Sequence, residues 1–237
     1  MSRPSIIFLD AVGTLFGVQG TVGEIYSQFA LEIGIEVDAQ QLNKAFMASF
    51  FAAPKPAFLG IDPAVLSIHE LAWWQDIAQQ SFAKVGLLEQ FSDFDHFFRR
   101  LFDHFATAAP WFVYPEVPQA LANWQAEGIT LGVISNFDSR LYAVLETLNL
   151  SQYFTSVTIS TVAGVAKPDA QLFKTALAKH DCPAKAAWHI GDSWQDDYEG
   201  ANQAGLRGIW LNRDQQLPPS PAKVEIADLL GLALPSP

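Results

Sequence analysis

Short apolar runs, each ending in a polar residue, constrain the fold of this chain more than any other feature of its sequence. Such runs cover Ile6–Asp10, Ile129–Ser135, Val157–Ser160, Ala186–Asp192 and Gly208–Asn212. Runs that are apolar on both faces are typical of strands buried inside a parallel sheet. Segments with helical periodicity lie between them, at Val117–Glu127, Ser139–Leu148, Asp169–Lys179 and Asp196–Ala204. This alternation predicts an α/β fold with a Rossmann-like, doubly wound parallel sheet.

The stretch between the first two runs breaks this rhythm and has a helical pattern throughout. Helices are expected over Thr21–Ile33, Asp38–Phe51, Ala64–Lys84 and Ser92–Ala106. Twelve of the 18 Phe residues fall between positions 17 and 107. At helical spacing these aromatic residues, Phe51 among them, indicate an apolar core separate from that of the sheet. We therefore expect a discontinuous core domain of residues 1–16 and 108–237, with a helical cap inserted at residues 17–107.

The charge of the chain limits the classes of partner that it can bind. Its 14 Lys and Arg residues against 25 Asp and Glu residues give a formal net charge of −11. Such a charge repels phosphate backbones and anionic lipid surfaces, so we expect a small-molecule substrate and neither nucleic acid nor membrane as a partner. Cys182 is the only cysteine, and no apolar run is long enough for a secretory signal or a membrane span. The expected location is therefore the cytoplasm, while the oligomeric state is left open.

Polar side chains stand where the predicted strands end, which is where open parallel sheets carry their functional sites. Asp10, Ser135 and Asp192 close three of the runs, and Lys167 lies in the loop after another. A single Asp in such a place is most often a helix cap or a turn residue. Four such groups in four successive strand–helix units predict a site that combines two carboxylates, a hydroxyl and a cation.

The same residues belong to four motifs that follow one another in a fixed order. Asp10–Phe16 reads DAVGTLF, Ile134–Asn136 reads ISN, Lys167–Pro168 reads KP and Gly191–Asp197 reads GDSWQDD. In order and spacing these segments resemble the motifs of the haloacid dehalogenase-like (HAD) hydrolases of subfamily I, and the cap lies where that family often inserts one. Three runs, VGTLF at residues 12–16, SNFDSRL at 135–141 and KPD at 167–169, are similar to the branch named after a rhythmically expressed gene product. The resemblance covers nearly the whole chain.

The resemblance implies a Mg²⁺ site at these strand ends. The carboxylates of Asp10 and Asp192 and the backbone carbonyl of Val12 are the expected ligands, because Mg²⁺ prefers oxygen. An acidic residue of the following helix, Asp197 in preference to Asp196 by register, is expected to support this metal set. The cation would neutralise part of the charge of the nucleophile and orient a phosphoryl group.

The resemblance also implies roles for the other polar residues of the motifs. Asp10 is the expected nucleophile, forming an aspartyl-phosphate that water then hydrolyses. Lys167 is the expected catalytic and phosphate-binding cation, which neutralises developing charge. Thr14, Ser135 and Asn136 are expected to bind the phosphoryl group or the substrate. These roles describe a Mg²⁺-dependent hydrolase that acts on a small phosphorylated metabolite.

Val12 departs from the family pattern. HAD phosphatases usually carry a second Asp at this position, which protonates the leaving group and then activates water. Valine can do neither, and a general acid–base group typically contributes about 10²–10⁴-fold to the rate. Three explanations stay open: the cap supplies another acid or base, the leaving group needs no proton, or the protein binds a ligand without turnover.

A metal-independent 2-haloacid dehalogenase is a further alternative, because the first motif of those enzymes also reads Asp-Ala-x-Gly-Thr-Leu-Phe. Dehalogenases usually lack the Gly-Asp pair of the fourth motif and carry an Arg early in the cap. In this chain Gly191 and Asp192 are both present, and no Arg lies between Arg3 and Arg99. Both observations favour the metal-dependent hydrolase.

A few residues outside the motifs have both a structural and a functional interpretation. Lys55 lies between two prolines in a predicted cap loop, where we expect a solvated lysine rather than one that forms a Schiff base. Of Trp73 and Trp74, at least one is expected in the apolar core of the cap. His189 lies inside an apolar run, where a hydrogen-bonded core histidine is more common than a catalyst.

Overall fold

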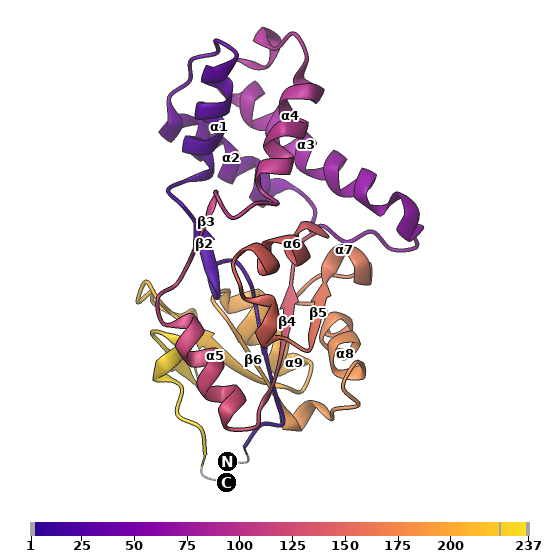
Figure 1. The fold of residues 1–237 in the computed structure, drawn as a ribbon, viewed down its shortest axis with the longest axis vertical. Coiled ribbons are helices and arrows are strands. Elements are labelled where there is room, and N and C mark those ends of the chain that lie inside the picture. The colour runs from indigo at the N-terminus through magenta and orange to yellow at the C-terminus, as the bar shows by residue number, and fades with distance from the viewer. Residues whose placement is uncertain (1–2, 223, 236–237) are drawn as a thin grey trace.

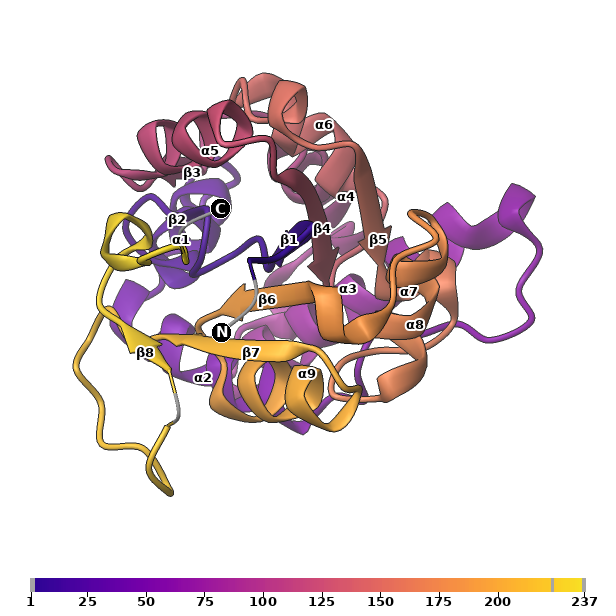
Figure 2. The same cartoon turned by 90° about the horizontal axis from the view of Figure 1, so that it is seen from below.

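One parallel sheet forms the centre of the core domain in the computed structural model, which describes residues 3–222 and 224–235. Its strand order is β5-β4-β1-β6-β7-β8, and helices cover both of its faces (Figure 1, Figure 2). The strands are β1 (Ile6–Leu9), β4 (Thr130–Ser135), β5 (Ser156–Ile159), β6 (Ala187–Gly191), β7 (Arg207–Leu211) and β8 (Glu225–Ile226). This is the expected α/β fold with a doubly wound sheet. The expected core domain also includes residues 1–2, 223 and 236–237, which lie outside the described residues.

The core helices follow the strands that the sequence predicts, with two additions. They are α5 (Val117–Ala126), α6 (Arg140–Thr147), α7 (Ser160–Ala163), α8 (Ala170–Ala178) and α9 (Gly200–Gln203), the last preceded by a π-helical turn over Trp194–Glu199. Strand β8 and the short helix α7 were not expected, because two and four residues are too few for a periodic pattern. Short 3₁₀ turns cover Pro63–Val65, Leu88–Gln90, Ser151–Tyr153, Ala184–Ala186 and Leu229–Gly231.

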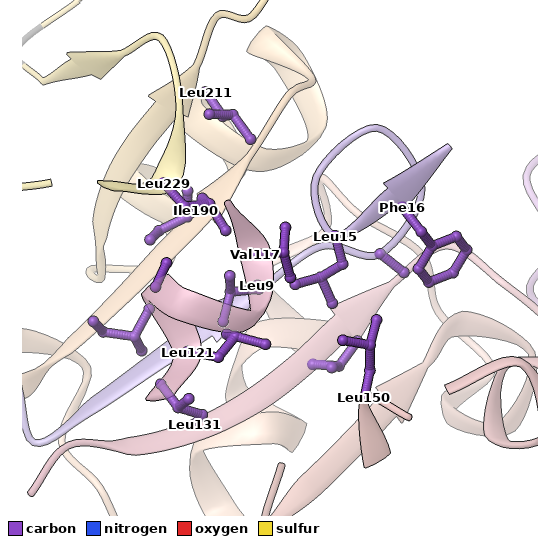
Figure 3. Packing of buried hydrophobic residues seen from close by; sticks show 14 of the residues in the cluster. Leu9, Leu15, Phe16, Val117, Leu121, Leu131, Leu150, Ile190, Leu211 and Leu229 are labelled. Atoms are coloured by element: carbon purple, nitrogen blue, oxygen red, sulfur yellow. The ribbon is translucent and has the colours of Figure 1, made fainter. Parts of the chain in front are cut away.

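The central strand β1 is buried on both faces. Ile7 and Leu9 belong to one apolar cluster, whereas Ile6 and Phe8 belong to another on the opposite side of the sheet. Successive side chains of a strand point to opposite faces, so this partition requires helices on both sides. Figure 3 shows Leu9 in the first cluster, beside side chains of α5 such as Leu121. Full burial stabilises each such side chain by about 1.5–3 kcal/mol, which fixes the carboxyl end of β1 in place.

Four helices form a separate lobe above the sheet, between the short strands β2 (Phe16–Val18) and β3 (Trp111–Val113) (Figure 1). They are α1 (Val22–Glu32), α2 (Ala39–Ala52), α3 (Leu66–Lys84) and α4 (Phe94–His104). The two strands pair antiparallel and connect the lobe to the sheet; the sequence did not predict them. We refer to residues 17–107 as the cap, bounds that stay a prediction from the sequence.

Aromatic side chains form the apolar core of the cap. Phe82, Phe97 and Phe98 are almost completely buried, and their rings lie in contact with those of neighbouring Phe residues. The expected aromatic core is therefore present, with one correction: Phe51 is 75% exposed. Phe50 and Phe51 are adjacent on α2, so their side chains point about 100° apart and only one can face the core. Within the described residues, no helix is long and apolar enough to cross a membrane.

Candidate active site

Three adjacent strands bring the first, second and fourth motifs together. Asp10 follows β1, Ser135 ends β4 and Asp192 follows β6, and β1 lies between the other two strands. All three strands run in the same direction, so these residues meet at one edge of the sheet. Lys167 enters the same edge from the loop between α7 and α8. The expected convergence of four polar residues is thus what the structure contains.

Lys167 is the centre of this cluster. Its side chain is 2% exposed, and its Nζ donates to Asp10 Oδ1 at 2.6 Å and to Asp197 Oδ1 at 2.6 Å. The third donor of the ammonium group goes to the backbone carbonyl of Ile134 at 3.0 Å. One buried cation therefore joins two buried carboxylates, with all of its donors used.

Burial and the neighbouring charges together raise the pKa values of both Asp10 and Lys167. Burial raises the pKa of Asp10, and the Lys167 ammonium offsets part of that rise. Burial alone would lower the pKa of Lys167, but the carboxylates of Asp10 and Asp197 raise it above its ordinary value. Lys167 is therefore a permanent cation at neutral pH rather than a proton donor.

Asp197 is held by core groups through both of its oxygens. Its Oδ1 lies 2.9 Å from Nε2 of His189, and its Oδ2 accepts from the backbone N–H of Ser193 at 3.0 Å. The neighbouring Lys167 and His189 outweigh the effect of burial and hold the pKa of Asp197 well below its usual range. His189 is completely buried, which lowers its pKa and favours the neutral imidazole that donates to Asp197. It is thus the hydrogen-bonded core histidine that the sequence predicts.

Three carboxylates at this edge form a group that suits a divalent cation. One oxygen each from Asp10, Asp192 and Asp197 lies within 4.8 Å of the others. Desolvation and repulsion from the other two carboxylates raise the pKa of Asp192 to about 7, although the residue as a whole is exposed at the rim. Gly13 has φ +86°, and a Cβ added to it would lie 2.5 Å from Oδ2 of Asp192. Only a glycine at this position lets the first motif approach Asp192 so closely. The neighbouring carboxylate oxygens of Asp10, Asp192 and Asp197 are ligands of the kind that Mg²⁺ prefers.

The remaining predicted site residues lie around this carboxylate group. Thr14 is completely buried, and its hydroxyl is 3.4 Å from Asp192 Oδ1. Ser135 is buried beside Asp10, and its hydroxyl lowers the pKa of that carboxyl. Asn136 accepts from the backbone N–H of Lys167 at 2.7 Å. Val12 forms a bridge with Phe16 and has a partly buried, apolar side chain, so it supplies no proton.

Arg213 supports the first motif and was not predicted from the sequence. Its Nη2 donates to the carbonyl of Thr14 at 2.8 Å and its Nε to that of Gly13 at 3.2 Å. The guanidinium also pairs with Glu116 at 2.6 Å and lies 3.7 Å from the ring centre of Tyr114. In the sequence, only the position of Arg213 shortly after the β7 run indicates that it lies near the strand ends. Position alone does not predict its contacts with the first motif.

Lys55 lies closer to the site than the sequence suggests. Its Nζ donates to the backbone carbonyl of Lys167 at 2.7 Å and forms an ion pair with Asp196. Its side chain is 45% exposed. This exposure agrees with the expected solvated loop lysine, but the contacts with the core were not predicted from the sequence.

Two further cap side chains bind the segment that follows the second motif. Glu70 of α3 is buried and accepts from the backbone N–H of Ser139 at 2.9 Å, from the Ser139 hydroxyl at 2.8 Å and from the Thr161 hydroxyl at 2.6 Å. Trp74 Nε1 donates to the buried Asp138 at 2.6 Å. The indole of Trp74 thus joins the cap to the core, while its ring packs against Phe50 of the cap.

Comparison with known proteins identifies the family. A family model described as haloacid dehalogenase-like hydrolase matches residues 4–205. The chain belongs to the haloacid dehalogenase-like hydrolases. It is 32% identical over 213 residues to haloacid dehalogenase-like hydrolase domain-containing protein 3 of Bos taurus, covering 89% of this chain and 83% of the relative. It is also 29% identical over 216 residues to the Rhythmically expressed gene 2 protein of Drosophila melanogaster, covering 86% and 82%. The branch inferred from the sequence motifs is confirmed.

Solved structures share the fold of this HAD hydrolase. A defluorinating L-2-haloacid dehalogenase superposes with a TM-score of 0.76 at 15% identity, covering 98% of this chain and 96% of that one. A HAD phosphatase from Thermococcus onnurineus superposes with a TM-score of 0.66 at 18% identity, covering 95% and 94%. Phosphatases and dehalogenases thus share this fold, and the choice between the two activities depends on the site.

Proposed function

We propose that this HAD hydrolase is a Mg²⁺-dependent phosphohydrolase that acts on a small phosphorylated metabolite through Asp10. The observation that carries the proposal is the position of Lys167, which is buried between Asp10 and Asp197 while Asp192 adds a third carboxylate. One cation cannot neutralise three carboxylates, so the group has excess negative charge that a divalent ion relieves. The net charge of −11 disfavours nucleic acid and anionic membrane surfaces as partners, which is in keeping with a small-molecule substrate. We also propose a cytoplasmic location.

The Mg²⁺ site would use Asp10, Asp192 and the carbonyl of Val12, with Asp197 as a support. Asp197 already accepts from Lys167, His189 and Ser193, which suits an orienting role. When bound, Mg²⁺ supplies positive charge that offsets the repulsion between the Asp10 carboxylate and an anionic phosphoryl group.

The side chains of the site would perform nucleophilic attack, orientation of the nucleophile and binding of the phosphoryl group. Asp10 attacks phosphorus, and the bond to the leaving oxygen breaks as the aspartyl-phosphate forms. Lys167 keeps Asp10 ionised and fixes the direction of its carboxylate through the 2.6 Å hydrogen bond. The hydroxyls of Ser135 and Thr14 are placed to donate to phosphoryl oxygens, because both lie buried beside the carboxylates. Water then attacks phosphorus and releases phosphate from Asp10.

Asp192 favours this function over metal-independent dehalogenation. A nucleophile that attacks carbon without a metal gains nothing from a second carboxylate nearby, because repulsion only raises the pKa of both groups. Here the pKa of Asp192 rises to about 7, a cost that a bound cation would remove. The cap also lacks an Arg before Arg99, whereas dehalogenases carry one early in the cap.

Hydrolysis of 4-nitrophenyl phosphate by the purified chain tests the proposal. We expect turnover that requires Mg²⁺, stops with EDTA and is abolished in Asp10→Asn, a variant of nearly the same shape. Release of chloride from 2-chloropropionate without a metal would contradict it and support the dehalogenase. If neither substrate reacts and Val12→Asp gains phosphatase activity, the natural chain is a binding protein on a complete phosphatase scaffold.

A further inference from the structure

The proposed reaction lacks a proton donor for the leaving group. At residue 12, two positions after the nucleophile, the chain carries a valine. Lys167 does not fill the gap, because its three donors are all used and its pKa is raised. A leaving group that needs a proton would therefore require a donor that reaches the site from outside the strand ends.

Lys55 is the cap residue that meets this requirement. Among the described residues, it is the one basic side chain of the cap that hydrogen-bonds to the core. Its Nζ donates to the carbonyl of Lys167 at 2.7 Å, while the ammonium of that same residue donates to Asp10 at 2.6 Å. Lys55 thus contacts the main chain of the same residue whose side chain contacts the nucleophile. Asn136, which follows Ser135, also donates to the Lys167 carbonyl at 3.0 Å, so Lys55 lies at the wall formed by the second and third motifs.

The loop around Lys55 is built to hold this lysine in place. Proline rings on both sides restrict the backbone at positions 54–56, and Pro56 is itself buried. The indole of Trp73 donates to the carbonyl of Pro54 at 2.9 Å, which ties the loop to helix α3. The backbone is therefore ordered before any substrate binds, and only the lysine side chain needs to adjust.

The other charged groups at the contact between cap and core are less suited to proton transfer. Glu70 is 2% exposed and accepts three hydrogen bonds from Ser139 and Thr161. Asp138 is 1% exposed and is paired with Arg140 and Trp74. Both are buried carboxylates with fixed structural partners. Lys55, by contrast, uses two of its three donors on Lys167 and Asp196, and its 45% exposed side chain can exchange protons with solvent.

We propose that Lys55 is the general acid of this enzyme and takes over the role that Val12 cannot perform; the inference rests on the proposed function. In the first step Asp10 forms its bond to phosphorus, the bond from phosphorus to the leaving oxygen breaks, and a proton passes from the Lys55 ammonium to that oxygen. In the second step the neutral Lys55 amine accepts a proton from water as the water oxygen bonds to phosphorus and Asp10 is released. The ammonium is restored, so protons balance over the cycle.

Asp196 is a positioning residue in this scheme. Its carboxylate forms an ion pair with Lys55 and also accepts from the Asn136 amide at 3.3 Å. It therefore holds the lysine against the wall that carries Ser135 and Asn136.

A series of phosphate monoesters with different leaving groups tests the proposal. Acid catalysis matters little for 4-nitrophenyl phosphate, whose leaving group is a stable anion, and matters most for ethyl phosphate, whose alkoxide is strongly basic. We expect Lys55→Met to reduce kcat about threefold or less with 4-nitrophenyl phosphate and at least about 10²-fold with ethyl phosphate, with phenyl phosphate between them. Val12→Asp in the Lys55→Met background should restore most of the loss with ethyl phosphate.

Matched variants separate acid catalysis from the effects of charge and position. Lys55→Arg keeps the charge but is a poor proton donor, so it should behave like Lys55→Met across the series. Lys44→Met, at an exposed cap lysine, and His69→Asn, beside Phe58 of the same loop, should leave the series unchanged. Thermal unfolding of each variant verifies that it is folded, as expected for an exposed position.

The outcomes distinguish this inference from the proposed function. An equal loss in Lys55→Met for all three esters, full activity of Lys55→Arg on ethyl phosphate, or no loss at all would overturn the role of Lys55. If the natural chain hydrolyses none of the three esters in the presence of Mg²⁺, the proposed function itself fails, and the acid has no reaction to serve.

Discussion

The core and the cap each bury a carboxylate, but they compensate it in different ways. Asp197 in the core is 1% exposed and is paired with the Lys167 ammonium at 2.6 Å. Glu70 in the cap is 2% exposed, and its described partners are neutral N–H and O–H groups of Ser139 and Thr161. Ion pairing keeps charge available where a reaction needs it, whereas neutral donors simply hold two parts of the chain together. The comparison is consistent with the catalytic role that we propose for the core cluster, whereas the Glu70 contact joins the cap to the core.

Removal of the core cation should have the largest effect. In Lys167→Met, Asp10 and Asp197 are left as buried carboxylates without their cation, and Ile134 loses a donor to its carbonyl. We expect kcat on 4-nitrophenyl phosphate to fall about 10³-fold and the free energy of unfolding to fall by about 3–5 kcal/mol. Steady-state kinetics and urea unfolding measure the two effects. Lys174→Met, at an exposed position of α8, is the control and should change neither.

Removal of the cap carboxylate should affect stability more than chemistry. Glu70→Ala leaves the backbone N–H of Ser139 and the hydroxyl of Thr161 without their acceptor. We expect a loss of about 1–3 kcal/mol in the free energy of unfolding, with kcat on 4-nitrophenyl phosphate kept within about threefold. Glu89→Ala, at an exposed cap position, is the control. A loss of kcat as large as that of Lys167→Met would break the distinction between the two carboxylates.

The third carboxylate of the core predicts how metal affinity depends on pH. The pKa of Asp192 is raised to about 7 in the metal-free protein, so below that pH a proton competes with Mg²⁺ for the site. The apparent Kd should therefore be about tenfold higher at pH 6 than at pH 8. Calorimetric titration of the EDTA-treated protein with Mg²⁺ measures it. An affinity that is constant over this range would place the cation away from Asp192.

The two adjacent tryptophans of the cap differ in how exposed their hydrogen-bond acceptors are, and this difference predicts the smallest effect. Trp74 Nε1 donates to the buried Asp138, whereas Trp73 Nε1 donates to the more exposed carbonyl of Pro54. Trp74→Phe should lower the free energy of unfolding by about 1 kcal/mol more than Trp73→Phe, because water can replace the partner of only the second donor. Urea unfolding of both variants provides the measurement. The opposite order would mean that the Asp138 contact contributes little to cap docking.

The strand ends could be predicted because a few consecutive residues are enough to identify a buried parallel strand. A short run that is apolar on both faces has few alternatives to a buried parallel strand, and its last residue then lies at the functional edge of the sheet. That argument placed Asp10, Ser135 and Asp192 correctly. The motif spacing similarly added Lys167, which enters from a loop.

The contacts between cap and core could not be predicted in the same way. They join segments far apart in the sequence, such as Glu70 with Thr161, and no periodic pattern fixes how one helical lobe sits on another part of the chain. Two weak signals were nevertheless present. Glu70 falls at helical spacing between the apolar Leu66 and Trp74, on a face that should be buried. Lys55 stands between two prolines, which fix a loop more firmly than a solvated lysine requires.

Single-turnover analysis of Asp10 tests the central claim of this account most directly. The chain is mixed with 4-nitrophenyl phosphate and Mg²⁺ in H₂¹⁸O, quenched in acid at early and late times, and digested for mass spectrometry. We predict a transient phosphoryl group on the peptide that contains Asp10, with ¹⁸O appearing in the released phosphate and not in the Asp10 carboxylate. Turnover without a phosphorylated Asp10 peptide at any time, or ¹⁸O in the Asp10 carboxylate, would contradict nucleophilic attack by Asp10 on phosphorus.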